Sequence, residues 1–220
     1  MKVTKEKAAD NRAALVQAAG RLFRERGIDG VGVAEISKTA GLTHGALYAQ
    51  FPSKEALAAE AFASGLKPGF EQMTADRDGR PATVADFLDH YLSFDHRDNL
   101  ATGCPMAASA SEVARQDKVI GERFTEGFEQ IIAVMERGLG ASSVKAEKRQ
   151  RAMAMMVAMI GGVAAARAVA KTDPKLSNEI LRAVRRIVGE VGGHEGRLME
   201  RRGERGLRGS ARSAESRGRV

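Results

Sequence analysis

Apolar residues recur at helical spacing from the start of the chain. Between Lys5 and Arg26 they fall one, three or four residues apart, which gathers them on one face of a single helix. Gly27 follows directly and supplies a C-terminal stop. The apolar face of this predicted helix consists of Leu15, Val16, Ala19, Leu22 and Phe23.

Two short helices are predicted next, on either side of the tight turn AGLT. Gly41 stops the first, and Thr43 has the side chain of an N-cap for the second. Ser53 then begins a connecting helix that contains EALAAEAFASGL. The residues expected to lock the short helices together are Val33, Ile36, Ala40, Leu42, Leu47 and Phe51.

The rest of the chain also has a helical pattern. Thr83 and Asp86 form a predicted capping box, and no segment alternates as a strand does. Aromatic residues make up only 5% of the chain and Trp is absent, which favours helices over a β-sandwich. We therefore predict an all-α protein with further helices near residues 84–96, 105–115, 118–139, 144–171 and 175–191.

Composition and charge restrict the class of protein. The longest apolar run, at residues 152–166, is shorter than the roughly 18 residues that a membrane-spanning helix needs. No signal-peptide pattern opens the chain, so a soluble, cytoplasmic protein without a membrane partner is expected. The net charge is +7, but residues 196–220 hold eight Lys and Arg against three Asp and Glu. Residues 193–220 are predicted to be a disordered basic tail, either a solvated terminus or an arm that seeks phosphate.

A helix, a short turn containing glycine and a second short helix together form a helix-turn-helix, predicted at about residues 32–51. In this motif the second helix lies in the DNA major groove. Small and polar residues at its leading end let the backbone approach base edges and phosphates. Tyr48 and Lys54 can reach phosphates on either side. The leading end consists of Thr43, His44, Gly45 and Ala46.

Residues 9–69 resemble the N-terminal domain of the TetR family of bacterial transcriptional regulators. The resemblance rests on AALVQAAGRLFRERGIDG followed by VGVAEISKTAGLTHGALYAQFPSKEAL. It implies a three-helix DNA-binding domain and a larger helical domain, at residues 70–192, that binds an effector and dimerises. The residues that it implies in DNA contact are Gly32, Val33, Ala34, Thr43, His44, Gly45, Ala46, Tyr48 and Lys54.

Two positions depart from the family pattern. Gly32 stands where the family often has Thr or Ser, so the hydroxyl contact to a phosphate is absent. Gln50 replaces a common His, which puts any contact from that position in doubt. The alternatives for Tyr48 and His44 are a half-buried aromatic and a solvated surface histidine.

The last two long helices are predicted to form the dimer interface. The segment AMAMMVAMIGGVAAARAVA is apolar on nearly all sides and rich in small residues, which requires burial on more than one face. In the final helix the arginines lie outside an apolar stripe. The members of this stripe are Leu181, Val184, Ile187, Val188 and Val191.

Cys104 is the single cysteine, and it directly precedes Pro105, a favoured first helical residue. A sulfur at a helix N-terminus is favoured as thiolate, which makes Cys104 a candidate effector or redox site. The short motif also resembles a subgroup of the family, that of the N-ethylmaleimide reductase operon repressor, in which a cysteine senses electrophiles. The alternative is a buried and inert cysteine.

Aspartates and histidines crowd residues 86–98, but these residue types also describe a solvated face, and no metal site is expected. Common catalytic motifs are absent, and neither an enzyme activity nor a cofactor is expected. The prediction is a homodimeric repressor that binds a pseudo-palindromic double-stranded operator and leaves it when a small-molecule or electrophile effector arrives. The alternatives are an activator of the same family, a thiol-dependent small-molecule-binding protein with a vestigial DNA module, and a thiol-dependent detoxifying enzyme.

Overall fold

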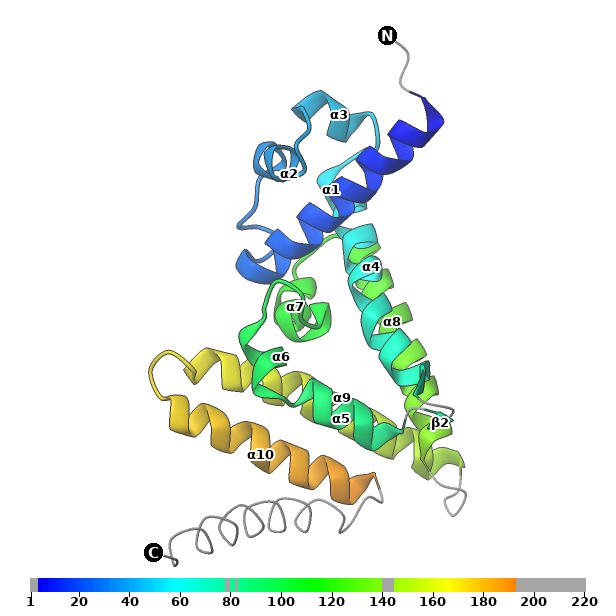
Figure 1. The fold of residues 1–220 in the computed structure, drawn as a ribbon, viewed down its shortest axis with the longest axis vertical. Coiled ribbons are helices and arrows are strands. Elements are labelled where there is room, and N and C mark those ends of the chain that lie inside the picture. Colours follow the sequence, from blue (N-terminus) through cyan, green and yellow to red (C-terminus); the bar gives the residue numbers. More distant parts are fainter. Residues whose placement is uncertain (1–3, 78–79, 82, 140–144, 193–220) are drawn as a thin grey trace, which may run out of the picture.

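The computed structural model describes residues 4–77, 80–81, 83–139 and 145–192, and the predicted tail at 193–220 lies outside this range. The described part is almost entirely helical, which confirms the all-α fold class (Figure 1). Its elements are α1 (Lys5–Arg26), α2 (Val33–Thr39), α3 (His44–Tyr48), α4 (Lys54–Thr74), β1 (Asp76–Arg77), β2 (Arg80–Pro81), α5 (Val84–Tyr91), α6 (Phe94–Asp98), α7 (Pro105–Val113), α8 (Lys118–Gly138), α9 (Lys145–Val169) and α10 (Pro174–Val191).

Side-chain caps decide where several helices begin. The hydroxyls of Thr43 and Ser53 accept hydrogen bonds from the backbone N–H groups of Ala46 and Ala56, at 3.3 and 3.1 Å. Each bond satisfies an amide that the first helical turn leaves free. The predicted capping box at Thr83 is also present, because its hydroxyl and the Asp86 carboxylate satisfy each other's backbone amides. These helix starts could be predicted from the sequence because each cap joins two residues that are three positions apart.

Two details of the helical prediction were wrong. The helix predicted over residues 84–96 is two helices, since the backbone leaves helical geometry at Leu92 and Ser93 then caps α6. The hydroxyl of Ser93 accepts a hydrogen bond from the His96 amide at 3.1 Å. A two-residue antiparallel pair, Asp76–Arg77 with Arg80–Pro81, was also not predicted. At Ser93 a local cap outweighed the helical periodicity.

Two apolar clusters are joined through α4. The smaller one holds α1, α2 and α3 against the first half of α4, with Leu15, Ile36 and Leu47 fully buried. The larger one begins at Phe62 in the same helix and includes residues from α5 and from α7 to α10. In Figure 1, α1, α2 and α3 lie at one end of the molecule, and α4 runs beside α8 toward the other end. Helix α4 therefore belongs to both clusters.

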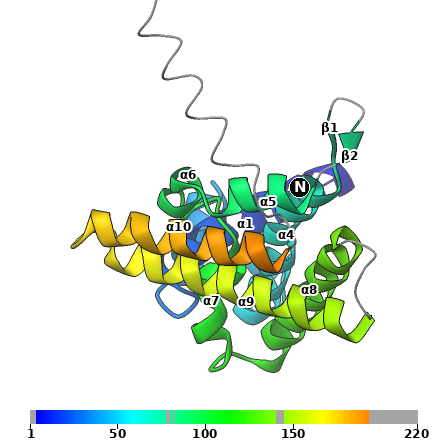
Figure 2. The same cartoon turned by 90° about the horizontal axis from the view of Figure 1, so that it is seen from below.

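Helices α9 and α10 pack side by side along one edge of the molecule (Figure 2). The segment Ala146–Val169 is long and apolar enough to cross a membrane by length and composition, although the sequence analysis expected no such span. Of its most apolar window, 44% is buried inside the protein. The residues of the apolar stripe predicted on α10 differ in burial. Leu181 and Val188 face the core, whereas Ile187 is 48% exposed.

Gly162 permits the close contact between these two helices. A Cβ at this position would lie 2.8 Å from Cγ2 of Val184 on α10, which is closer than real atoms approach. Valine is branched at Cβ and has little rotational freedom with which to withdraw. Small size at residue 162 is therefore a packing requirement.

We expect Gly162→Ala to lower the free energy of unfolding by about 1 kcal/mol, because overpacking costs roughly 1–3 kcal/mol and the gain in helix propensity offsets part of it. Urea denaturation followed by circular dichroism measures the change. Gly121→Ala is the matched control, since a Cβ at residue 121 meets no atom within 4 Å. Equal effects of the two substitutions would show that the contact with Val184 is not tight.

Candidate nucleic-acid interface and adjoining cavity

The predicted helix-turn-helix is present as α2, the turn at Gly41, and α3. Gly41 adopts a positive φ of 69°, which permits the sharp reversal between the two helices. Ile36, Leu47 and Phe51 are buried in the small cluster, as predicted, while Val33, Ala40 and Leu42 are partly buried against it. The inner face therefore fixes α3 in place and leaves its outer face in solvent.

The residues predicted for DNA contact mostly lie on this outer face. Thr43, His44, Gly45 and Tyr48 are exposed, and Ala46 is half-buried. Gly45 would meet no atom within 4 Å if it had a Cβ, so another molecule can approach its backbone closely. The rings of His44 and Tyr48 are in edge-to-face contact, with centroids 5.1 Å apart. Tyr48 is 50% exposed, so both interpretations of its side chain, a DNA contact and a half-buried aromatic, agree with the structure.

The beginnings of α2 and α4 flank α3. Gly32 is the N-cap of α2 and offers no side-chain hydrogen bond to the helix. No side chain therefore caps the first amides of α2, and Gly32 and Ala34 are exposed, with Val33 half-buried. Lys54 is the first residue of α4 and is half-buried.

Arg12 fixes the turn between α3 and α4, a role that local sequence patterns did not indicate. Its guanidinium donates a 2.7 Å hydrogen bond to the backbone oxygen of Gln50 and forms an ion pair with Glu60. It also lies 4.1 Å from the ring centroid of Phe51. One side chain of α1 thus holds the end of α3 against α4, and the only signal in the sequence was a lone arginine on the polar face of the first helix.

A cavity of about 100 Å³ lies in the other part of the molecule, between α4, α5, α7, α8 and α9. Cys104 is at its wall, where it is half-buried and serves as the N-cap residue of α7. Its thiol makes no capping hydrogen bond to the helix. The cavity is lined mainly by apolar and small residues, among them Leu66, Phe87, Ile131 and Met156.

His96 reaches this wall and is not on a solvated face as the sequence analysis supposed. Its Nδ1 lies 2.6 Å from the backbone oxygen of Tyr91, and its Nε2 lies 3.0 Å from the backbone nitrogen of Cys104. A carbonyl accepts and an amide donates, so the two contacts select the neutral ring with its proton on Nδ1. The pKa of His96 is lowered from 6.5 to about 4, chiefly by burial and in smaller part by the Arg167 guanidinium. The ring therefore ties the N-terminus of α7 to the end of α5.

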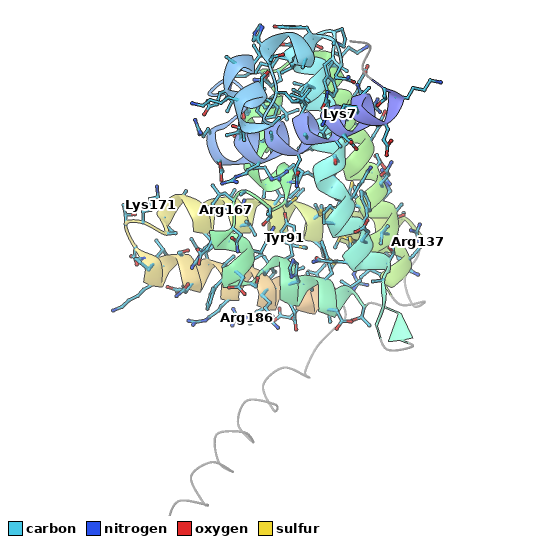
Figure 3. All side chains as sticks on the ribbon, turned by 45° about the horizontal axis from the view of Figure 1, so that its top comes forward. Lys7, Tyr91, Arg137, Arg167, Lys171 and Arg186 are labelled. Atoms are coloured by element: carbon cyan, nitrogen blue, oxygen red, sulfur yellow. The ribbon has the colours of Figure 1, made fainter. Side chains whose placement is uncertain are left out.

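Tyr91 lies in the interior, and its ring forms part of the cavity wall (Figure 3). The side chain is 4% exposed, and its hydroxyl has no hydrogen-bond partner in the described part of the chain. Burial raises the pKa of Tyr91 well above its ordinary value, and the adjacent Cys104 thiol raises it further although the pair does not meet hydrogen-bond geometry. The hydroxyl therefore stays protonated. Tyr91 was not predicted as a site residue, because its spacing matches that of an ordinary core aromatic.

Helix α7 connects this cavity to the small cluster. At its C-terminal end, Oε1 of Glu112 accepts hydrogen bonds from the amides of Ile28 and Asp29, at 2.6 and 3.0 Å. Before its N-terminal end, the backbone oxygen of Ala101 accepts a 2.7 Å hydrogen bond from Nε of Arg24 on α1. Both contacts join residues more than 70 positions apart. They link the cavity wall to the helix that carries Arg12.

The histidines and acidic residues of α5 and α6 do not converge on one point. Within the described ranges no group of three or more His, Cys, Asp or Glu residues could hold a metal ion. Asp89 pairs with Arg185, and His90 contacts Gln72 at 3.1 Å. The described part of the chain thus presents cysteine and tyrosine side chains, and no candidate metal centre, beside the cavity.

Comparison with known proteins identifies both parts of the chain. The family model for bacterial regulatory proteins of the tetR family matches residues 15–61, and that for the C-terminal domain of LmrA/YxaF-like transcriptional regulators matches residues 82–184. The HTH-type transcriptional regulator LmrA of Bacillus subtilis is 28% identical over 159 residues, which span 70% of this chain and 84% of LmrA.

Solved structures share the fold. Reduced Escherichia coli NemR superposes with a TM-score of 0.64 at 21% identity, covering 82% of this chain and 96% of NemR. A TetR transcriptional regulator from Legionella pneumophila gives a TM-score of 0.67 at 16% identity, covering 86% of this chain and 98% of that one. At these identities the superpositions establish the fold alone.

The pKa of His96 leads to a prediction about stability and pH. Because burial lowers its pKa from 6.5 to about 4 in the folded protein, the unfolded chain binds more protons between these values. The contribution of the neutral ring is therefore complete above pH 6.5 and is lost as the pH falls toward 4. We expect the stability advantage of the wild type over His96→Asn to shrink through this window. Urea denaturation of both proteins from pH 7.5 to 4 measures it, and a constant difference would contradict the assignment.

Proposed function

Because the chain belongs to the TetR family of bacterial regulatory proteins, we propose that it is a cytoplasmic, homodimeric repressor that binds a pseudo-palindromic operator. Regulators of this family bind operator DNA as dimers, and the related proteins are transcriptional regulators rather than enzymes. The observation that carries the proposal is the outer face of α3. Its fixed inner face and its exposed small and polar leading end fit the DNA major groove.

Phosphate contacts would come from both sides of α3. The uncapped amides at the start of α2, around Gly32, suit an anion, and Lys54 at the start of α4 supplies a positive charge. A lysine in the first turn of a helix is electrostatically unfavourable unless an anion is near. A bound phosphate would therefore remove a penalty that the free protein carries.

The dimer interface is proposed on the outward side of α9 and α10. Three large aliphatic side chains on these neighbouring helices are exposed, which is unusual: Val157 by 60%, Leu176 by 42% and Ile187 by 48%. Small exposed residues continue the surface along α9 and would permit close packing between helices. These are Ala154, Gly161, Ala164, Ala165 and Ala168. A second copy would bury this surface in a four-helix bundle.

Release from DNA is proposed to follow a change in the distance between the two recognition helices. Effector binding at the cavity would shift α7, and the contacts of Glu112 and Arg24 would pass that shift to α1. A hundredfold loss of operator affinity requires about 2.7 kcal/mol of differential effector binding to the two dimer states. A covalent adduct at Cys104 or a well-fitted ligand can supply this energy.

Whether the protein represses or activates transcription can be tested directly. The same DNA-binding geometry serves an activator when the operator lies elsewhere relative to the promoter. Deletion of the gene should raise expression of a reporter fused to the operator-containing promoter. If the protein is an activator, expression should fall instead.

A thiol-dependent enzyme would consume more than one electrophile molecule per Cys104. Measuring the electrophile consumed when it is in excess distinguishes such an enzyme from a sensor that reacts once.

We expect Lys54→Ala to weaken binding to all DNA sequences and to reduce the slope of log affinity against log salt by about one phosphate per protomer. Gel shifts with DNA from upstream of the gene, at several salt concentrations, measure the slope. Lys171→Ala is the control, because Lys171 lies beyond α9, far from α3 (Figures 1 and 3). An unchanged slope in Lys54→Ala would contradict the phosphate contact.

Electrophile release gives a second prediction. N-ethylmaleimide should abolish the gel shift of the wild type but leave that of Cys104→Ser, because this chain has one cysteine. Both proteins should bind the operator equally before treatment, since Cys104 lies in the cavity wall and not on α3. Release that persists in Cys104→Ser would refute the thiol as sensor. Binding that N-ethylmaleimide leaves intact in the wild type would do so as well and would favour a non-covalent ligand.

A further inference from the structure

Among the described residues that line the cavity, Tyr91 has a buried hydroxyl without a hydrogen-bond partner. A buried hydroxyl without a partner costs roughly 1–3 kcal/mol, and few such groups occur in a folded protein. The hydroxyl belongs to a cavity-lining side chain that is 4% exposed, and the thiol of Cys104 lies beside it. A ligand atom that accepts this hydrogen bond would therefore sit close to the sulfur.

The other polar side chains of the cavity wall either have partners or lie at the surface. Both ring nitrogens of His96 have backbone partners, and His90 and Gln72 contact each other at 3.1 Å. Thr102 is exposed at the rim. Among the described residues that line the cavity, this leaves Tyr91 as the buried hydrogen-bond donor without a partner and Cys104 as the nucleophile.

The size and charge of the cavity restrict that molecule. A volume of about 100 Å³ is well below the roughly 300–1,000 Å³ of sites for drug-sized ligands. No Asp, Glu, Lys or Arg lines it, so the wall itself offers a charged ligand no ion pair in return for lost hydration. The ligand that fits is small and uncharged, and it has one hydrogen-bond acceptor near an electrophilic carbon.

We propose that this cavity captures small, uncharged α,β-unsaturated carbonyl compounds, with the Tyr91 hydroxyl donating a hydrogen bond to the carbonyl oxygen while the Cys104 sulfur adds to the β-carbon. The inference rests on the proposed function in taking Cys104 as the effector site. It adds a second residue to that site and names the class of compound.

The chemistry is a conjugate addition that needs no co-reactant. The thiol loses its proton to water, and the sulfur forms a bond to the β-carbon as the carbon–carbon π bond breaks. The electron pair moves to the carbonyl oxygen, where the Tyr91 O–H stabilises the developing enolate. A proton from water then attaches to the α-carbon. Nothing leaves, nothing is oxidised, and the product is a thioether at the N-cap of α7.

The test measures the rate of adduct formation on the full chain without DNA. Methyl vinyl ketone is the carbonyl probe, and 2-hydroxyethyl disulfide is an uncharged thiol reagent that has no carbonyl group. Intact-protein mass spectrometry follows the mass gain, and Cys104→Ser gives the background from other side chains. Tyr91→Phe retains the ring and removes the hydroxyl. Ser109→Ala, which removes a buried hydroxyl of α7 outside this cavity wall, is the matched control.

We expect Tyr91→Phe to react about tenfold more slowly with the ketone, the effect of one transition-state hydrogen bond, and within about twofold of the wild type with the disulfide. Ser109→Ala should match the wild type with both reagents. An unchanged ketone rate in Tyr91→Phe would overturn the proposal. Equal slowing with both reagents would overturn it too, because Tyr91 would then act on the thiol and not on the carbonyl.

A comparison that uses only the wild type covers the case in which Tyr91→Phe does not fold. The ratio of the ketone rate to the disulfide rate should be about tenfold higher for Cys104 than for free N-acetylcysteine amide. Equal ratios would overturn the proposal. Neither assay contains DNA, so the two proposals can fail separately. If the protein captures the ketone selectively but binds no operator, the proposed function is refuted and this inference stands.

Discussion

The carboxylate of Glu112 fixes the position of the DNA-binding part, at α1, relative to the larger helical part, at α7. It accepts hydrogen bonds from two consecutive amides, those of Ile28 and Asp29, in the turn that follows α1. Gly27 makes this possible, because its positive φ of 79° turns the chain and a Cβ there would lie 3.1 Å from the carboxylate. A charged acceptor on two backbone donors is stronger than an ordinary hydrogen bond. The orientation of α1 thus depends on the position of α7.

Helix α7 is a single short element. It has nine residues, from Pro105, next to Cys104 at the cavity, to Val113, next to Glu112. Arg24 adds a second tether, because it binds the backbone oxygen of Ala101 in the segment that leads to Cys104. In the proposed function, a group bound at the N-cap would displace an element whose two ends are both tied to the DNA-binding part. In this arrangement a shift of α7 would reach α1 directly, without a long chain of intermediate contacts.

Local patterns predicted the parts of the fold that local interactions determine. Thr43, Ser53 and Thr83 cap helices because the amides they satisfy are three residues away, and burial of Ile36 and Leu47 follows from helical spacing. The contacts of Arg12, Glu112 and His96 could not be predicted in this way. Glu112 and Ile28 are 84 positions apart, and a glutamate on a helix gives no sign of its partner. Tyr91 was missed for a related reason, since periodicity predicts that an aromatic is buried but not whether its hydroxyl is satisfied.

An unsatisfied hydroxyl beside a nucleophile also bears on the energetics of switching. An effector shifts an equilibrium only by its difference in affinity for the two states. The free protein carries the cost of the unpaired Tyr91 hydroxyl, roughly 1–3 kcal/mol, and a ligand that satisfies it recovers that energy in the bound state. This is of the same order as the 2.7 kcal/mol needed for a hundredfold release. If the hydrogen bond can form only when α7 has shifted, one unsatisfied group in the free protein accounts for much of the coupling to DNA.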